Sequence, residues 1–220
     1  MTQSARARFS FLRSLCRTGL LLALGACTAG EHAVTAASAR TSAPASAATP
    51  APAASPGDAL QALIEASGVR CADAQTAHGC TAGNLDAGDF YDVDLSPDCG
   101  DDGFFASVAQ AKGADALDRV PTTGSNARPR ARFAQGQFVC IQGIGRAGQQ
   151  PLYYYVMAVP TGSVAKCNDN ALCSNGDRPI QRTVQGSGGA CRVTAPGIYA
   201  GDCAQGWVSA DTLDVFSNGM

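Results

Sequence analysis

The sequence predicts a small, mainly β domain, an antiparallel barrel or sandwich, with one or two short helices at its N-terminal side and disulfide bridges that staple it. Short runs rich in Val, Ile, Phe and Tyr recur through the second half of the chain, as β-strands require. Gly and Pro separate these runs, as they do at turns. Eight cysteines follow residue 58, the even number that a disulfide framework needs.

The first 26 residues have the layout of a secretory signal peptide. Four arginines precede residue 18, and a short apolar run follows at 20–24. The run ends in Leu24-Gly25-Ala26-Cys27, which resembles the lipobox of bacterial lipoproteins. The resemblance implies that Cys27 becomes the first mature residue and carries a diacylglycerol and a further acyl chain such as palmitate. Thr28, in place of Asp, implies the periplasm-facing side of an outer membrane.

Residues 27–57 are nearly all Ala, Ser, Thr and Pro after the cysteine, so we expect a disordered tether. Without the signal peptide, twelve Lys and Arg remain against eighteen Asp and Glu, a net charge of −6. Nucleic-acid binding is not expected, because phosphate contacts need clustered cations. An acidic surface would instead attract a basic protein at long range.

The folded domain is expected over 58–220, with its helical part first. Asp58, followed by Gln61 three residues on, has the form of a capping box and predicts a helix that stops at Ser67-Gly68. Alternation over 90–95 predicts a half-buried strand. A second short helix is expected at 104–112, a further turn at 113–120 and a loop at 121–132.

From there on the signals are for strands. Residues 137–144 and 152–159 predict a hairpin joined by 145–150. Shorter strands are expected at the following positions: 163–166, 179–185, 191–194, 198–200 and 206–209.

Part of this region resembles bacterial SH3-like domains. The resemblance rests on Gly136-Gln137-Phe138-Val139-Cys140-Ile141, on Tyr154-Tyr155-Val156 and on a closing Gly206-Trp207-Val208 that Leu213 follows. It implies peptidoglycan binding. The chain departs from that family in lacking the opening Leu-x-Val-Arg element and in carrying four extra cysteines before the closing strand.

Eight cysteines can be joined in about 105 ways, and sequence alone does not choose among them. Pairing between near neighbours is the arrangement we expect, and the expected 191–194 and 198–200 strands would bring the last pair close. The expected pairs are Cys71 with Cys80, Cys99 with Cys140, Cys167 with Cys173, and Cys191 with Cys203.

No catalytic or metal-binding signature is present in the sequence. Only His78 of the two histidines lies in the folded part, without a Gly-x-Ser-x-Gly context. Cys-x-x-Cys and His-x-x-x-His patterns are missing from the sequence, and exported cysteines are expected to be oxidised. We therefore expect no enzyme, cofactor or metal, and a surface role for His78.

A run of acids is the most distinctive feature of the folded part, and several interpretations of it stay open. The run could bind Ca²⁺, although the EF-hand spacing is not matched. It could also hold the carboxylate pair of a glycosidase. Otherwise it forms a solvated face, which could in turn be a patch that binds a partner protein. The run contains Asp86, Asp89, Asp92, Asp94, Asp98, Asp101 and Asp102.

Four arginines, Arg128, Arg130, Arg132 and Arg146, flank the expected hairpin and are candidates to pair with the acidic run. Tyr154 should face opposite to Tyr153 and Tyr155 in its strand, so at least one tyrosine is free for a partner. Trp207 is expected to be a core residue.

These observations favour a non-catalytic envelope lipoprotein that binds peptidoglycan or a basic periplasmic protein, with an inhibitor or immunity protein against a cell-wall lytic enzyme as the sharper version. The alternatives are an envelope hydrolase that uses carboxylates in 86–102, and a structural component of an envelope complex. The candidate partner-binding residues are Asp92, Asp94, Asp101, Asp102 and Tyr154.

Overall fold

A computed structural model describes residues 55–100, 103–164, 167–174, 176–184, 186 and 189–216. These residues belong to one compact unit. The expected signal peptide, Cys27 and the expected tether up to residue 54 lie outside them. In the described part, no helix has both the length and the apolar character needed to cross a membrane.

The prediction of a mainly β, disulfide-stapled domain is confirmed. In the described residues, one α-helix is followed by thirteen strands and several single-turn 3-10 helices. Eleven strands form one antiparallel sheet that does not close into a barrel, and two form a separate hairpin. The SH3-like resemblance stays a prediction.

The elements follow one another in this order: α1 (Pro56–Ser67), β1 (Arg70–Asp73), β2 (His78–Asn84), η1 (Leu85–Ala87), β3 (Asp89–Leu95), β4 (Phe104–Val108), β5 (Ala114–Leu117), β6 (Pro129–Phe133), β7 (Phe138–Ala147), β8 (Gln150–Ala158), η2 (Thr161–Ser163), η4 (Ala171–Cys173), β9 (Gln181–Arg182), β10 (Arg192–Ala195), β11 (Ile198–Ala200), β12 (Gln205–Ser209), η5 (Ala210–Thr212) and β13 (Leu213–Phe216).

Helix α1 begins earlier than the sequence suggested. Ser55 is its N-cap and forms the capping box with Asp58, so Asp58 is the third helical residue and not the cap, and Gln61 takes no part. Pro56 suits the first turn, where its missing N–H costs nothing. The helix ends at Gly68, whose φ of 68° is the left-handed conformation that favours glycine.

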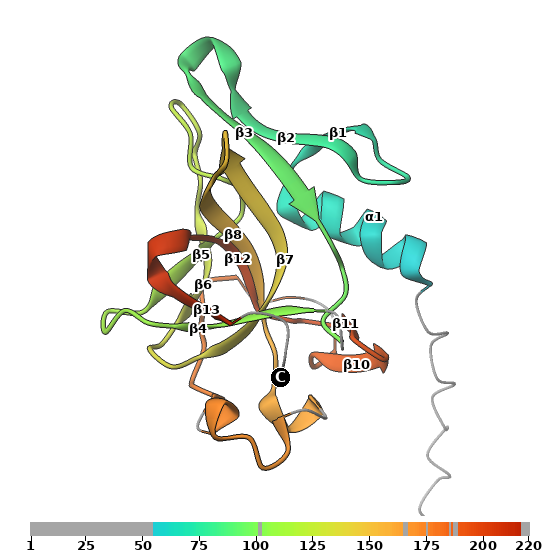
Figure 1. Cartoon of the computed structure of the whole chain (residues 1–220), viewed down its shortest axis with the longest axis vertical. Helices are drawn as coiled ribbons and strands as arrows, with labels where there is room; N and C mark the ends of the chain where they lie inside the picture. The colour runs from blue at the N-terminus through green and yellow to red at the C-terminus, as the bar shows by residue number, and fades with distance from the viewer. Residues whose placement is uncertain are drawn as a thin grey trace, which may run out of the picture. The chain divides into compact units, whose positions relative to one another are not determined.

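Strand β7 organises the sheet. Along one edge it pairs with β8; along the other its first half pairs with β4 and its second half with β3. The path then continues from β8 through β12 and β5 to β6 and β9, and from β3 through β2 to β1. Figure 1 shows the β2–β3 hairpin projecting beyond the rest of the sheet.

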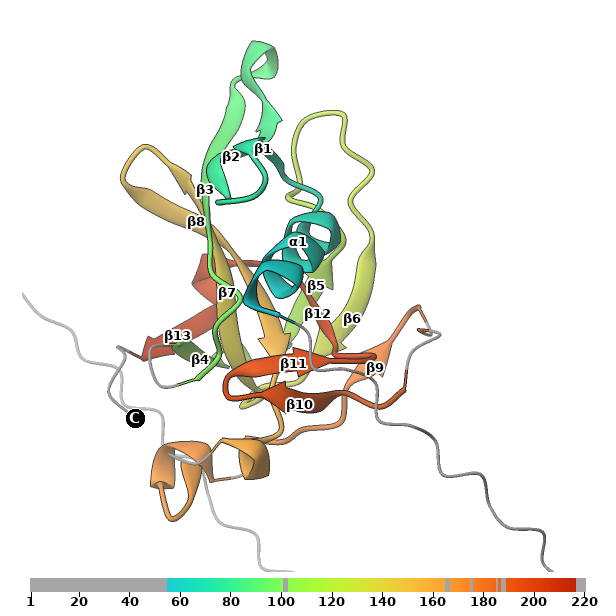
Figure 2. The ribbon, with the colours of Figure 1, turned by 90° about the vertical axis from the view of Figure 1, so that its right-hand side faces the viewer.

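Three packed clusters hold the domain together. One face of the sheet buries the inner core, which includes Phe133, Ile141 and Val208. The other face packs against α1 in the helix core, which includes Leu63 of the helix and Trp207 of the sheet. Figure 2 shows α1 in front of the sheet, with the β10–β11 hairpin below it. A third cluster, the disulfide core, surrounds two of the bridges.

The expected cysteine pairing is confirmed. In the last pair, β10 and β11 are adjacent antiparallel strands, as predicted. The bridges are Cys71–Cys80, Cys99–Cys140, Cys167–Cys173 and Cys191–Cys203.

Several element predictions were wrong. The helix expected at 104–112 is strand β4, because Ala106 and Val108 are buried between β7 and β13. The turn expected at 113–120 contains β5, and the end of the expected loop is β6. Strands β1, β2 and β13 had not been predicted. The strand expected at 163–166 is absent from its described residues, since η2 ends at Ser163 and Val164 is not in a strand.

Candidate binding surface

Two aspartates of the predicted patch lie on the face of β3 that points away from α1. Because side chains alternate along a strand, Asp92 and Asp94 point opposite to Val93, which is buried in the helix core. Both aspartates are exposed. Asp101 and Asp102 lie outside the described residues.

The register of three strands brings Tyr154 to the same face. Asp94 lies opposite Ile144 of β7, and Ile144 lies opposite Tyr154 of β8. Two interstrand spacings therefore separate Asp94 from Tyr154, about 10 Å. Asp92 lies opposite Arg146, whose Nε is 3.2 Å from a carboxylate oxygen of Asp94.

We call this surface the hairpin face. It consists of Phe90, Asp92, Asp94, Ile144, Arg146 and Tyr154. Phe90 keeps 37% of its surface exposed, and Leu85 at the hairpin tip keeps 72%. Tyr154 is half-buried, with its ring packed against the inner core. The predicted orientation of Tyr154, opposite to Tyr153 and Tyr155, is confirmed. The hairpin face thus combines aromatic, aliphatic and charged groups on one side of the sheet.

Other acids of the run have structural partners. A carboxylate oxygen of Asp89 accepts a hydrogen bond from the Thr123 backbone N–H, which ties the hairpin to the β5–β6 loop and lowers the pKa of Asp89. Asp98 accepts the Gly100 N–H at 2.6 Å and so closes its own turn. Among the described residues, no three His, Cys, Asp or Glu side chains gather as a metal site would require.

Among the described residues, one of the four flanking arginines forms an ion pair with the acidic run. Arg146 pairs with Asp94, as described above. Arg130 instead donates to the Ala66 carbonyl at 3.1 Å, at the end of α1, and Arg132 forms an ion pair with Asp115. Arg130 and Arg132 therefore fix the fold, whereas Arg146 lies on the hairpin face.

Trp207 is a core residue, as predicted. It is fully buried, and its Nε1–H donates to the Ser67 carbonyl at 2.8 Å. Tyr155 packs edge-on against it with ring centroids 5.4 Å apart. The Tyr155 hydroxyl is buried without a hydrogen-bond partner among the described residues, and burial raises its pKa strongly. His78 is exposed, as expected, and is the first residue of β2 rather than part of a loop.

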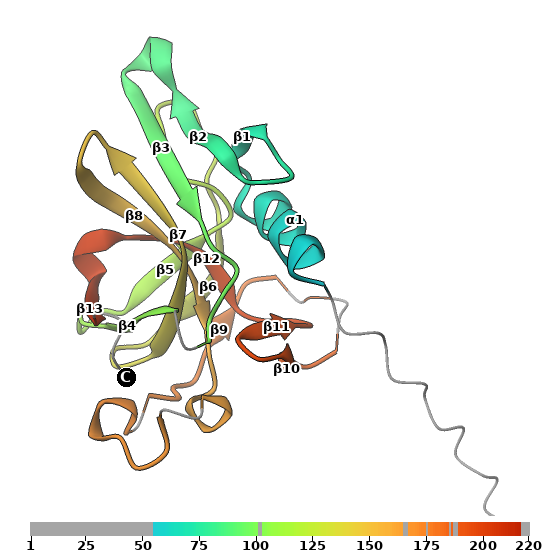
Figure 3. The ribbon, with the colours of Figure 1, turned by 45° about the vertical axis from the view of Figure 1, so that its right-hand side comes forward.

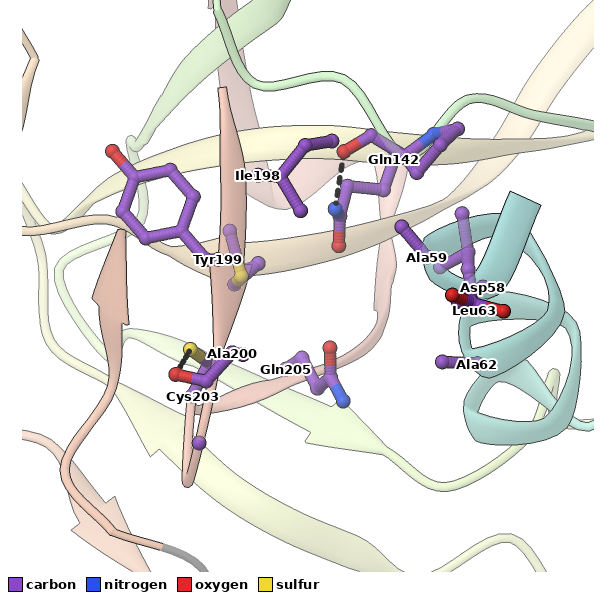
Figure 4. A pocket seen from close by; sticks show the side chains of 13 residues that line it. Asp58, Ala59, Ala62, Leu63, Gln142, Ile198, Tyr199, Ala200, Cys203 and Gln205 are labelled. Atoms are coloured by element: carbon purple, nitrogen blue, oxygen red, sulfur yellow. Dashed lines mark hydrogen bonds between the residues drawn. The ribbon is translucent and has the colours of Figure 1, made fainter. Parts of the chain in front are cut away.

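A pocket that no sequence pattern indicated lies between α1, the sheet and β11. It has a volume of about 250 Å³. Figure 4 shows Gln142 and Gln205 from the sheet, Tyr199 from β11 and Asp58 from the helix around it. These residues lie far apart in the sequence in unremarkable contexts, so no local pattern could have connected them.

Comparisons with known proteins identify no relative whose site could guide the interpretation of this surface. No family model matches the chain, and no curated protein or solved structure is significantly similar to it.

Proposed function

We propose that the protein is a non-catalytic binding module of the bacterial envelope, held on the outer membrane through Cys27, whose hairpin face recognises a basic periplasmic protein. The specific form that we favour is an inhibitor or immunity protein for a cell-wall lytic enzyme. Peptidoglycan is the competing ligand.

The observation that carries this proposal is the shared face of Asp92, Asp94 and Tyr154. These residues come from two strands that are not neighbours in sequence order, and the register aligns them across β7. Protein interfaces are enriched in aromatic residues and Arg at their centre and are polar at the rim. Phe90, Tyr154 and Arg146 give the hairpin face that composition.

Charge supports a basic partner. The mature chain has a net charge of −6, and the exposed aspartates concentrate negative charge on a projecting hairpin. Complementary charge accelerates association and discriminates against like-charged proteins. The single ion pair of Arg146 leaves Asp92 available to such a partner.

The test is a pull-down with the oxidised protein on beads, challenged with envelope extract and, separately, with purified sacculi. We expect capture of one basic protein, weakened by salt. Replacing Asp92→Asn and Asp94→Asn together should lower its affinity about tenfold at low salt. The matched control is Asp211→Asn with Asp214→Asn, which removes two exposed charges outside the hairpin face.

A second matched pair tests the apolar contribution. Phe90→Ala should weaken capture at all salt concentrations, because an aromatic anchor acts by burial and not by charge. Phe104→Ala removes an equally exposed ring, 44% accessible, from β4. Equal effects of the two phenylalanine variants, or retention on sacculi with no protein captured, would refute the hairpin face as the protein-binding site.

The alternative of an envelope hydrolase makes a different prediction. A single Asp substitution within 86–102 would abolish turnover of a wall substrate while the fold survives. The structural roles of Asp89 and Asp98 favour the binding module.

A further inference from the structure

The pocket beneath α1 lies away from the hairpin face and has walls from three parts of the chain. The first turns of α1 form one side, β11 forms the opposite side, and strands β7, β8 and β12 form the floor. The Cys191–Cys203 bridge fastens the β10–β11 hairpin beside it. Figure 3 shows α1 and β11 on the same side of the sheet, one above the other.

Gln142 is the buried polar group of the floor. It is the extra residue of a β-bulge, since Ile141 pairs with Val156 and Gly143 pairs with Tyr155. Bulges re-aim side chains and are common beside functional sites. The Gln142 side chain is only 8% exposed, and its Nε2 donates to the Pro97 carbonyl at 3.0 Å.

The other end of the same amide is unused. Gln142 Oε1 accepts no hydrogen bond from any described residue, and Figure 4 shows the side-chain amide at the space between α1 and β11. This oxygen is open to the pocket, since the fully buried side-chain atoms without a partner among the described residues are Asp89 Oδ1 and the Tyr155 hydroxyl. A ligand in the pocket can therefore donate a hydrogen bond to it.

Two further polar groups converge on this space. The Gln205 side-chain amide makes no hydrogen bond with a described residue, although it lines the pocket. At the rim, Asp58 uses one carboxylate oxygen for the Ser55 N–H and hydroxyl, which leaves the second oxygen as an acceptor. The lining therefore offers two acceptors and one amide that both donates and accepts.

The lining also disfavours charged ligands. Its described residues contain no Lys, Arg or His, so they offer no cation to hold a phosphate or carboxylate. The Asp58 charge is balanced at the N-terminus of α1, where the helix dipole is positive and a bound cation is disfavoured. Leu63, Met157 and Ile198 add apolar wall.

We propose that this pocket binds one neutral saccharide unit. Its hydroxyl or acetamido groups would donate to Gln142 Oε1 and Asp58 and exchange hydrogen bonds with Gln205. Its C–H face would lie on the apolar wall. Planar amide and carboxylate groups suit neighbouring sugar hydroxyls because each offers two polar atoms at fixed spacing. This site is separate from the hairpin face, so the two proposals stand or fall independently.

The test is an NMR titration of the purified, oxidised protein with glucose, N-acetylglucosamine and glucosamine, observing the side-chain amides of Gln142 and Gln205. We expect N-acetylglucosamine to shift both signals with a dissociation constant of about 1 mM, the range for a ligand of this size. No shift with either neutral sugar overturns the proposal. Tighter binding of protonated glucosamine than of the neutral sugars also overturns it, because the site would then be a cation site.

Matched variants assign the binding to the pocket. Gln142→Met should weaken it at least tenfold. Gln135→Met removes another glutamine that donates to a backbone carbonyl at 3.0 Å, but outside the pocket, and should change nothing. Ala62→Trp provides a second test should Gln142→Met fail to fold. Ala62 is exposed at the rim of the pocket, so a Trp side chain there should block entry of the sugar. Unchanged binding in Ala62→Trp would refute the assignment.

Discussion

Two buried aromatic side chains with polar groups, Trp207 and Tyr155, lie where α1 packs against the sheet, and they differ in their hydrogen bonding. Trp207 Nε1 has an acceptor, the Ser67 carbonyl, whereas the Tyr155 hydroxyl has none among the described residues. A buried donor that finds no partner costs the free energy of desolvation, typically ~1–3 kcal/mol. The Tyr155 ring itself packs well against Trp207. The hydroxyl therefore destabilises the fold while the ring stabilises it.

We expect Tyr155→Phe to raise the free energy of unfolding by about 1 kcal/mol at neutral pH. The difference should widen in alkali. Burial raises the pKa of Tyr155 in the folded state, so above the unfolded value of about 10 the unfolded chain loses its proton first. Stability then falls by ~1.4 kcal/mol per pH unit for this residue. Urea unfolding at pH 8 and above pH 10 measures both effects.

The Trp207→Phe variant is the contrasting control, because it removes a hydrogen bond that is made. It should lower the free energy of unfolding at every pH. A Tyr155→Phe variant that is less stable than the wild type would mean that the hydroxyl has a partner after all.

At the scale of the element, the projecting β2–β3 hairpin depends on one close backbone approach. Gly83 has a φ of 96°, and a Cβ there would lie 1.9 Å from the Asp89 carbonyl oxygen. Gly88, in the same hairpin, has a φ of 80° with nothing within 4 Å of its Cβ position. The two glycines share a left-handed backbone and differ in the space around them.

We therefore expect Gly88→Ala to cost about 1 kcal/mol, the penalty of a left-handed alanine. Gly83→Ala should cost about 3 kcal/mol or more, because the backbone of β3 must also move. Chemical denaturation compares the two, and binding of the basic partner should fall with Gly83→Ala alone. Equal losses of unfolding free energy in the two variants would show that the β3 backbone moves away from residue 83 at little cost.

Elements with clear periodicity could be predicted from the sequence. Strand β3 alternates, and the β7–β8 hairpin is rich in β-branched and aromatic residues, so both were placed correctly. Strand β4 was mistaken for a helix because the segment continues into 109–112, where Ala, Gln and Lys favour a helix. The pairing of β4 with β13 joins positions about a hundred residues apart. No local signal reports such a contact.

At the scale of the whole molecule, the candidate sites depend on contacts between segments that are distant in the sequence, which local patterns do not indicate. Composition identified Asp92, Asp94 and Tyr154, but the pairing of β3, β7 and β8 was needed to align them. The pocket could not be predicted, because a bulge at Gln142 and a helix packed across the sheet create it. The cysteines were the exception, since near-neighbour pairing needs little knowledge of the fold.

The proposed lipid on Cys27 would hold the protein on the membrane. Cys27→Ser should abolish incorporation of labelled palmitate and release the protein from the membrane fraction, because each buried CH₂ of an acyl chain contributes about 0.8 kcal/mol to membrane binding. Cys16→Ser is the matched control, since Cys16 would leave with the signal peptide and labelling should persist. A flexible tether of 30 residues would keep the domain within about 30 Å of the bilayer on average. The released Cys27→Ser protein should therefore still bind its basic partner in solution, since the hairpin face does not depend on the anchor. Palmitate labelling of Cys27→Ser would show that the lipid is attached elsewhere.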